Sequence, residues 1–233
     1  MGRRTFEADL LRLADEKQKE HILRTVTQLD PKEVIGVETP TIRKLAKTLW
    51  EKEQDECLDF LANDEHQYYE QYMLHGELIA LIKEPRVALR ETKHFVKMIN
   101  NWWVCDSLSV DIFDKEDPQI YELVKTWLRS RHEYTVRYAI RLLMRNYMLV
   151  NFKEEYLQLV ADIKSKQSYV VKMIAGFFAE AIFQDWDKTI VYFDQRKLSP
   201  EKHNAAIKKA LESKKIIPLR KKYLEDLLLS EEN

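Results

Sequence analysis

A spacing of 35 residues recurs through the middle of the chain and restricts the folds open to it. Trp102, Arg137 and Lys172 follow one another at this interval, and Tyr134 and Tyr169 keep the same register. Repeats of this length are typical of helical hairpins stacked into a solenoid, in which equivalent residues lie along one shared surface. We therefore expect Trp102, Arg137 and Lys172 to line one groove.

Hydrophobic periodicity of roughly 3.6 residues predicts helices over most of the chain, and no segment shows the alternation typical of strands. Thr39-Pro40, Asp117-Pro118 and Ser199-Pro200 each read as an N-cap followed by a first-turn proline. Short connections favour antiparallel neighbours and leave no linker for a domain boundary. The sequence predicts an all-α helical-repeat solenoid with a concave groove, as a single domain over residues 1–233. The expected helices are 5–28, 39–53, 55–61, 65–83, 85–99, 102–113, 118–129, 133–148, 152–163, 168–183, 186–195, 200–212 and 218–229.

Charge is unevenly distributed along a chain whose net charge is −1. That balance argues against nucleic acid coating the whole surface. Residues 199–224, however, are locally basic and include Lys208 and Lys209. Two interpretations stay open for this end: a polar cap closing a solenoid, or a surface that contacts phosphates.

Several classes of site and location are not indicated by the sequence. The two cysteines, Cys57 and Cys105, form no CxxC spacing, and the six histidines show no metal-ligand spacing. We expect no metal and no cofactor. No apolar run approaches signal-peptide or membrane-spanning character. The sequence predicts a monomeric cytoplasmic protein with no membrane partner.

The best chemical lead is the pair formed by Trp102 and Asp106, which one helical turn places on the same helix face. A carboxylate can stabilise a developing cation or position a water, and an indole face attracts a cation. Together they suit a positively charged substrate. The alternative for Asp106 is a helix-face carboxylate paired with a neighbouring base. Trp103 points about 100° away from Trp102 and is expected in the core.

Three motifs resemble those of AlkD-type DNA alkylation repair proteins, over nearly the whole length: Gly36-Val37-Glu38-Thr39-Pro40 followed by Arg43, Trp102-Trp103-Val104-Cys105-Asp106, and Arg137-Tyr138-Ala139-Ile140. The resemblance implies a HEAT-like repeat fold and a DNA glycosylase that removes cationic N3- or N7-alkylpurines from double-stranded DNA. It also implies a catalytic role for Asp106, packing of Trp102 against the lesioned nucleotide, and a grip of Arg137 on the DNA backbone. Lys172, Lys208 and Lys209 are further expected DNA-binding residues.

Two features depart from that resemblance. Gly176 stands where active members carry a second groove tryptophan, and residues 24–34 lack the short amphipathic helix that contacts substrate. Three hypotheses therefore stay open. The chain is an alkylpurine glycosylase with narrowed or lost activity, a relative that binds alkylated or distorted duplexes without excision, or a HEAT-like scaffold for a protein partner.

Overall fold

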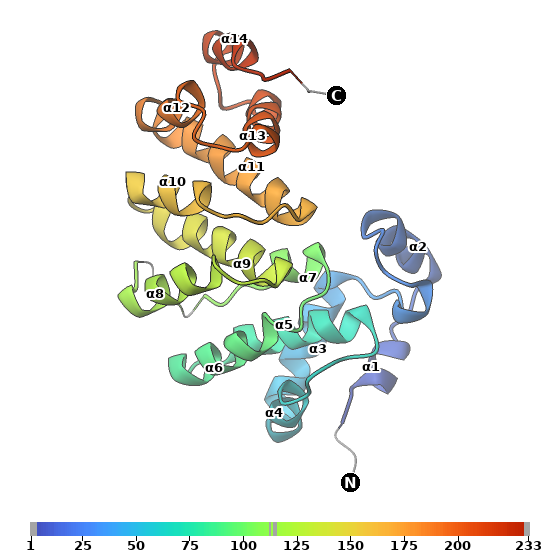
Figure 1. Cartoon of the computed structure of the whole chain (residues 1–233). Coiled ribbons are helices and arrows are strands. Elements are labelled where there is room, and N and C mark those ends of the chain that lie inside the picture. Colours follow the sequence, from blue (N-terminus) through green and yellow to red (C-terminus); the bar gives the residue numbers. More distant parts are fainter. Residues whose placement is uncertain (1–3, 112, 114–115, 231–233) are drawn as a thin grey trace. The chain divides into compact units, whose positions relative to one another are not determined.

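The computed structural model describes residues 4–111, 113 and 116–230, and over these residues every regular element is helical (Figure 1). The predicted all-α fold class is confirmed. None of the described helices is both long and apolar enough to span a membrane. The chain divides into two compact units, residues 1–113 and 114–233, and each is described by itself. The prediction of a single domain stays a prediction.

The first unit is organised around one buried helix, α5 (Tyr69–Leu81), which packs against α1, α3, α4, α6 and α7. Ten of its residues are buried, so α5 forms the centre of the core rather than a half-exposed surface helix. The other elements are α1 (Glu7–Leu11), α2 (Glu16–Thr25), the 3-10 helix η1 (Pro31–Glu33), α3 (Thr39–Lys52), α4 (Gln54–Leu61), α6 (Pro85–Phe95) and α7 (Trp102–Ser107).

The helix predicted over residues 5–28 is wrong, because the structure breaks it into α1 and α2. Asp15 caps α2 by accepting from the backbone N–H of Gln18 at 2.8 Å. Its own N–H donates to the carbonyl of Gly36 at 2.9 Å. A contact distant in sequence therefore fixes the break, and periodicity alone does not reveal it.

Gly36 occupies a close approach between two segments. Its φ of +100° lies in a region that L side chains rarely adopt, and a Cβ would meet the carbonyl oxygen of Asp15 at 2.3 Å. The buried carboxylate of Glu70 accepts from the N–H groups of Ile35, Gly36 and Val37 at 2.9, 2.7 and 3.3 Å. The glycine motif thus forms a structural joint that places α3.

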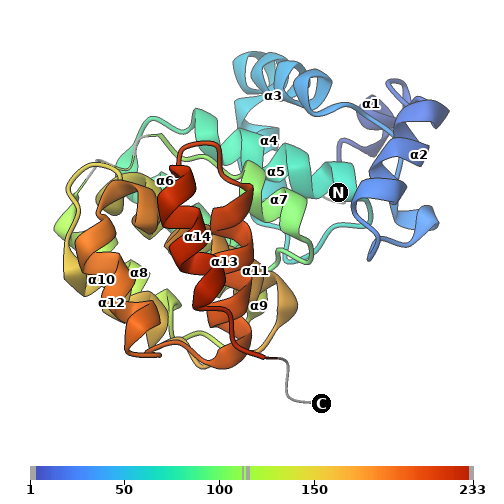
Figure 2. The ribbon, with the colours of Figure 1, turned by 90° about the horizontal axis from the view of Figure 1, so that it is seen from above.

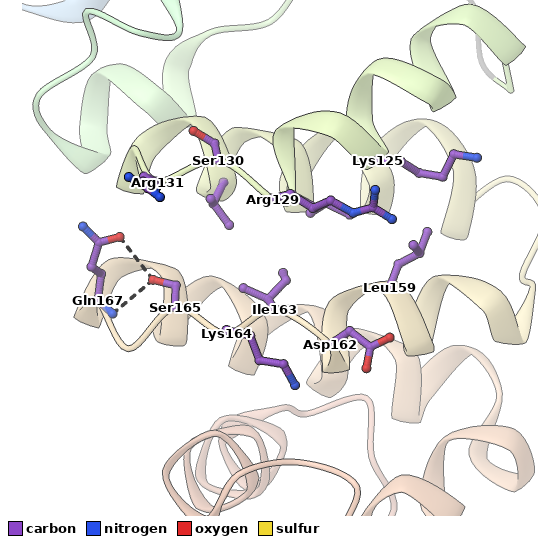
Figure 3. A pocket seen from close by; sticks show the side chains of 12 residues that line it. Lys125, Arg129, Ser130, Arg131, Leu159, Asp162, Ile163, Lys164, Ser165 and Gln167 are labelled. Carbon is purple, nitrogen blue, oxygen red and sulfur yellow. Dashed lines mark hydrogen bonds between the residues drawn. The ribbon is translucent and has the colours of Figure 1, made fainter.

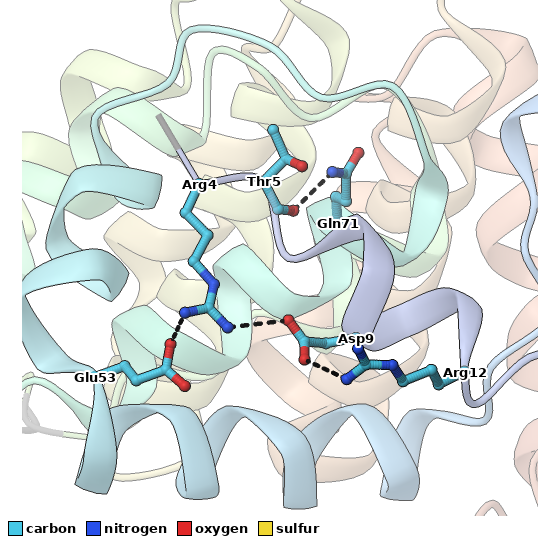
Figure 4. A network of polar contacts seen from close by, with 6 residues as sticks. All are labelled: Arg4, Thr5, Asp9, Arg12, Glu53 and Gln71. Atoms are coloured by element: carbon cyan, nitrogen blue, oxygen red, sulfur yellow. Dashed lines mark hydrogen bonds and ion pairs between the residues drawn. The ribbon is translucent and has the colours of Figure 1, made fainter. Parts of the chain in front are cut away.

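Polar contacts also hold the segment before α1 (Figure 4). Arg4 forms ion pairs with Glu53 of α4's N-terminus and with Asp9 of α1. The side chain of Gln71 on α5 donates to the carbonyl of Thr5 at 2.8 Å. The start of the described chain is therefore attached to the core helix of its unit.

The second unit is built from two layers of helices (Figures 1 and 2). Helices α9, α11 and α13 pack side by side and form one layer. Helices α8, α10 and α12 lie on one face of that layer. The prolines at positions 118 and 200 occupy first turns, as predicted. The elements are α8 (Pro118–Trp127), α9 (Glu133–Leu143), the π-helical turn η2 (Met144–Met148), α10 (Glu154–Ala161), α11 (Ser168–Gln184), α12 (Trp186–Asp194), α13 (Pro200–Glu212) and α14 (Pro218–Asp226).

The 35-residue register is visible in the second unit as a repeated turn. The Oγ atom of Ser130 accepts from the N–H of His132 at 3.1 Å, before α9. The Oγ atom of Ser165 accepts from the N–H of Gln167 at 3.2 Å, before α11. Equivalent positions in consecutive helix pairs therefore adopt the same local structure.

Candidate active site

The predicted catalytic pair lies on the short helix α7 of the first unit. Buried Asn101 caps this helix, because its side chain accepts from the N–H of Val104 at 3.0 Å. Trp102 and Asp106 follow one turn apart on one face, and both are half-buried. The helix predicted over residues 102–113 ends at Ser107, where the chain turns extended at the buried Leu108.

Aromatic rings surround the start of α7. The rings of Trp102 and Trp103 lie 5.6 Å apart at 31°, and the His21 ring of α2 meets Trp103 edge-on at 6.4 Å. Gln28, in the segment after α2, donates to the carbonyl of Asn100 at 3.4 Å. Trp103 thus contacts α2 and is half-buried, whereas the sequence placed it in the core.

Asp106 gains no stability from the helix dipole. It lies in the last turn of α7, where the helix dipole disfavours an anion by roughly 0.3 to 1 kcal/mol. A carboxylate there is better suited to stabilising positive charge outside the helix. This geometry allows electrostatic or water-positioning chemistry next to the half-buried indole of Trp102.

A cavity of about 280 Å³ adjoins α7 and is lined in part by Arg43, Glu77 and Ser107. Arg43 makes a two-pronged ion pair with Glu77, from Nε to Oε2 and from Nη2 to Oε1, each at 3.0 Å. The arginine that follows the glycine motif therefore links α3 to α5, which is a structural role.

Arg137 lies on α9 of the second unit and is only 8% exposed. Its Nη1 donates to the carbonyl of Tyr169 at 2.7 Å. The N–H of Tyr169 in turn donates to Oε1 of Glu133 at 3.0 Å. Arg137 therefore joins α9 to the first turn of α11, a structural contact that sequence reasoning did not anticipate.

The structure brings Lys172 to the same tyrosine. Its exposed ammonium lies 4.7 Å from the ring centroid of Tyr169, so Arg137 and Lys172 both meet this residue. Lys208 and Lys209 are exposed on a different helix, α13, and Lys209 pairs with Glu212 at 2.6 Å. The expectation that Trp102 shares a groove with Arg137 and Lys172 spans the two units and stays a prediction.

Gly176 lies on α11 one helical turn after Lys172, and so on the same face. A Cβ atom at this position would meet no heavy atom within 4 Å. The space next to Gly176 is therefore open at the Cβ position, and the glycine does not make a tight helix contact.

The site residues on α7, α9, α11 and α13 all fall within one match to a known family. A family model described as DNA alkylation repair enzyme matches residues 6–212. The chain belongs to this family. Neither a curated protein nor a solved structure matches the chain. Membership of the DNA alkylation repair family connects the protein with DNA repair and makes DNA its class of partner.

Burial disfavours thiol chemistry in this DNA alkylation repair family member. Cys57 and Cys105 are buried thiols, and burial raises the pKa of the Cys57 thiol to about 11, which disfavours a thiolate nucleophile. Within residues 4–111, 113 and 116–230, no group of three histidine, cysteine or acidic side chains could hold a metal ion.

Two contacts of the family member were missed at the sequence level. His21 reaches Trp103 from α2, and Glu70 holds the backbone of the glycine motif. Both depend on residues far apart in the chain. The sequence analysis used the glycine motif only as part of the family resemblance and predicted neither the tight approach at Gly36 nor the contact with Glu70.

Proposed function

We propose that this DNA alkylation repair family member hydrolyses the N-glycosidic bond of N3- or N7-alkylated purines in double-stranded DNA. The observation that carries the proposal is the pair on α7, Trp102 and Asp106, which share one half-buried face inside the region matched by the family. A cationic ring and a developing sugar cation are the two positive charges that such a pair can meet.

The chemistry needs little from the protein beyond electrostatics. Alkylation at N3 or N7 makes the purine a cation, so the base leaves without general-acid help. Positive charge then develops on the sugar, where the Asp106 carboxylate stabilises it and positions the attacking water. The side chain acts by charge, which is why its position at the end of a short helix matters.

Recognition is divided between Trp102 and the basic residues. The Trp102 indole face attracts the cationic base through its quadrupole. Arg137, Lys172, Lys208 and Lys209 supply phosphate contacts, which do not depend on sequence and weaken with salt. The buried Arg137 contributes by fixing Tyr169 and the start of α11 as well as by charge.

The test is release of methylated purines from alkylated duplex by the parent chain and by Asp106→Asn. We expect the amide to lower release by about 10² to 10³-fold and to leave duplex affinity unchanged, because it keeps the volume but not the charge. Asp59→Asn, on the exposed side of α4, is the matched control and should release base like the parent. Equal release by the parent and Asp106→Asn would remove Asp106 from the mechanism.

A second candidate function is binding of distorted duplex without base excision. The open space at Gly176, where an aromatic wall is expected, favours it. The same assay separates the two functions. If the parent chain binds duplex in a salt-dependent way but releases no methylated purine, the second function is selected.

A further inference from the structure

A cavity of about 530 Å³ lies in the second unit, between the loop joining α8 to α9 and the loop joining α10 to α11 (Figure 3). We call it the loop slot. Its lining includes none of Tyr169, Arg137 and Lys172. Its lining consists of residues 125, 128–131, 136, 159, 162–165 and 167.

The two lips of the loop slot are equivalent segments of consecutive repeats. Each lip has an apolar residue, a basic residue and a serine in succession, and each serine accepts from the N–H group two residues later. The side chains of the two segments lie on opposite sides of the slot (Figure 3). The equivalent pairs, 35 residues apart, are Leu128 and Ile163, Arg129 and Lys164, and Ser130 and Ser165.

Positive charge dominates the lining of the loop slot. Lys125, Arg129, Arg131 and Lys164 stand against one carboxylate, Asp162. Lys125 pairs with Glu122 on its own helix. The other three cations are exposed and make no ion pair with any residue in the described ranges of the chain. An anion in the slot would therefore meet three cations that form no ion pair with the described acidic side chains.

A buried cation lies behind one lip. Lys202 of α13 is 6% exposed, and its ammonium donates to the carbonyl of Ile163. Burial and the nearby charge of Lys164 lower the pKa of Lys202. Its positive charge adds to that of Lys164 on the same side of the slot.

Size and apolar lining restrict the ligand further. The space is within the range of roughly 300 to 1,000 Å³ typical of small-molecule sites, and it exceeds what a lone phosphate needs. Leu128, Val136, Leu159 and Ile163 supply apolar lining for a ring system. Guanidinium groups suit phosphate oxygens because their donors form a planar fork.

We propose that the loop slot binds a nucleotide, with its phosphate ester at Arg129, Arg131 and Lys164 and its ring system on the apolar lining. The nucleotide comes from one of two sources, a free mononucleotide or a unit of a DNA strand. Only the second source rests on the proposed function, and neither source requires base excision.

The first probe is deoxyadenosine monophosphate, titrated by calorimetry at low salt, with deoxyadenosine as the phosphate-free comparison. The Arg129→Glu/Lys164→Glu variant reverses one cation on each lip. We expect it to weaken monophosphate binding by at least about tenfold, as for loss of a charged hydrogen bond. Lys97→Glu, an exposed reversal in the first unit, is the charge control and should bind like the parent.

A second variant tests the cavity rather than its charge. Leu159→Trp fills the slot with an indole and keeps every cation, so it should also weaken monophosphate binding. If thermal melting shows this variant to be unfolded, the charge-reversal pair decides the test, because Arg129 and Lys164 are exposed.

Duplex DNA distinguishes the two sources. If a DNA strand is the source, the charge-reversal variant loses duplex affinity and the monophosphate competes with duplex. If a free nucleotide is the source, the variant loses monophosphate binding alone. Two results would overturn the proposal. The first is that deoxyadenosine binds as tightly as the monophosphate does. The second is that the charge-reversal variant loses no more affinity than Lys97→Glu, for both the monophosphate and duplex DNA. Base release is measured separately, so absence of glycosylase activity affects neither outcome.

Discussion

Two buried acceptors in the first unit and two buried cations in the second hold the backbone of neighbouring segments. In the first unit, the carboxylate of Glu70 and the amide oxygen of Asn101 accept from backbone N–H groups beside α3 and in α7. In the second unit, the cations of Arg137 and Lys202 donate to the carbonyls of Tyr169 and Ile163. The net charge of −1 conceals this division.

The difference corresponds to the chemistry proposed for each unit. Buried acceptors in the first unit fix the N-terminal ends of helices, including α7, which carries the Asp106 carboxylate. Buried cations in the second unit fix the loops that lead into α11, next to exposed cations suited to phosphate. In these four contacts, each unit therefore uses the kind of group proposed for its site: acceptors in the first unit and cations in the second.

The largest expected effect comes from removing Glu70. Glu70→Ala leaves the N–H groups of Ile35, Gly36 and Val37 buried without their acceptor, so we expect the free energy of unfolding to fall by roughly 4 kcal/mol. Chemical denaturation measures it. Glu70→Gln keeps one acceptor oxygen and should lose less.

Lys202→Met is the matched change in the second unit. It leaves one carbonyl without a donor but also removes the cost of burying a cation, so we expect a loss of only about 1 kcal/mol. A loss of stability as large as that of Glu70→Ala would mean that the buried cation of the second unit stabilises the fold as strongly as the buried carboxylate of the first.

Acid should destabilise the first unit through its buried histidines. Burial lowers the pKa of His66 to about 4 and that of its neighbour His75 well below the usual value. The unfolded chain binds these protons below about pH 6.5, whereas folded His66 does so only near pH 4. The contribution of His66 to the free energy of unfolding is therefore fully present above pH 6.5. It falls as the pH is lowered, and by pH 4 about 3 kcal/mol of it is lost.

Urea unfolding between pH 7 and pH 4 measures this loss. His66→Gln keeps a hydrogen-bonding side chain beside His75 without a titrating group, so its stability should depend less on pH. The exposed His21→Gln is the control. Amide protection, measured relative to intrinsic exchange rates at each pH, should fall with acid in α5 before it falls in α11. Equal pH dependence in parent and His66→Gln would contradict the assignment.

The sequence predicted the features that depend on neighbouring residues. The prolines at positions 40, 118 and 200 do occupy first turns, and Asp117 does cap α8. The cap of α3 is Glu38 rather than Thr39. The break between α1 and α2 was missed because it depends on Gly36, which lies far along the chain.

The candidate site shows the same limit. The step of one turn between Trp102 and Asp106 could be predicted, since it follows from helix geometry. The burial of Arg137 and its bond to Tyr169 could not, because both depend on the packing of α11, whose residues lie far along the chain. Long-range packing decides such roles.

Arg137→Ala tests whether this residue is structural, a phosphate contact, or both. Loss of its bond to the Tyr169 carbonyl should lower the free energy of unfolding by about 1 to 3 kcal/mol. As a phosphate contact, it should also reduce the salt dependence of duplex binding by about one counterion. Arg137→Lys keeps the charge and should restore the salt slope more than the stability. An unchanged slope in the stable fraction of Arg137→Ala would leave only the structural role.

The smallest expected effect on stability comes from Gly176 on α11. Since a Cβ there meets nothing within 4 Å, Gly176→Ala should stabilise the second unit by about 0.5 to 1 kcal/mol through helix propensity alone. Gly176→Trp should keep this gain, because the side chain leaves the helix into open space beside Lys172.

The two Gly176 variants together isolate the aromatic ring from the backbone effect. Gly176→Trp should bind alkylated duplex more tightly than Gly176→Ala, because an indole stacks on a base and attracts its positive charge. Thermal melting and duplex titration measure the two properties. A stable tryptophan variant that binds like the alanine variant would mean that the missing ring does not limit recognition, and residues 24–34 would become the segment to change next. Strong destabilisation of Gly176→Trp alone would show that the α11 face is closed beyond the Cβ position.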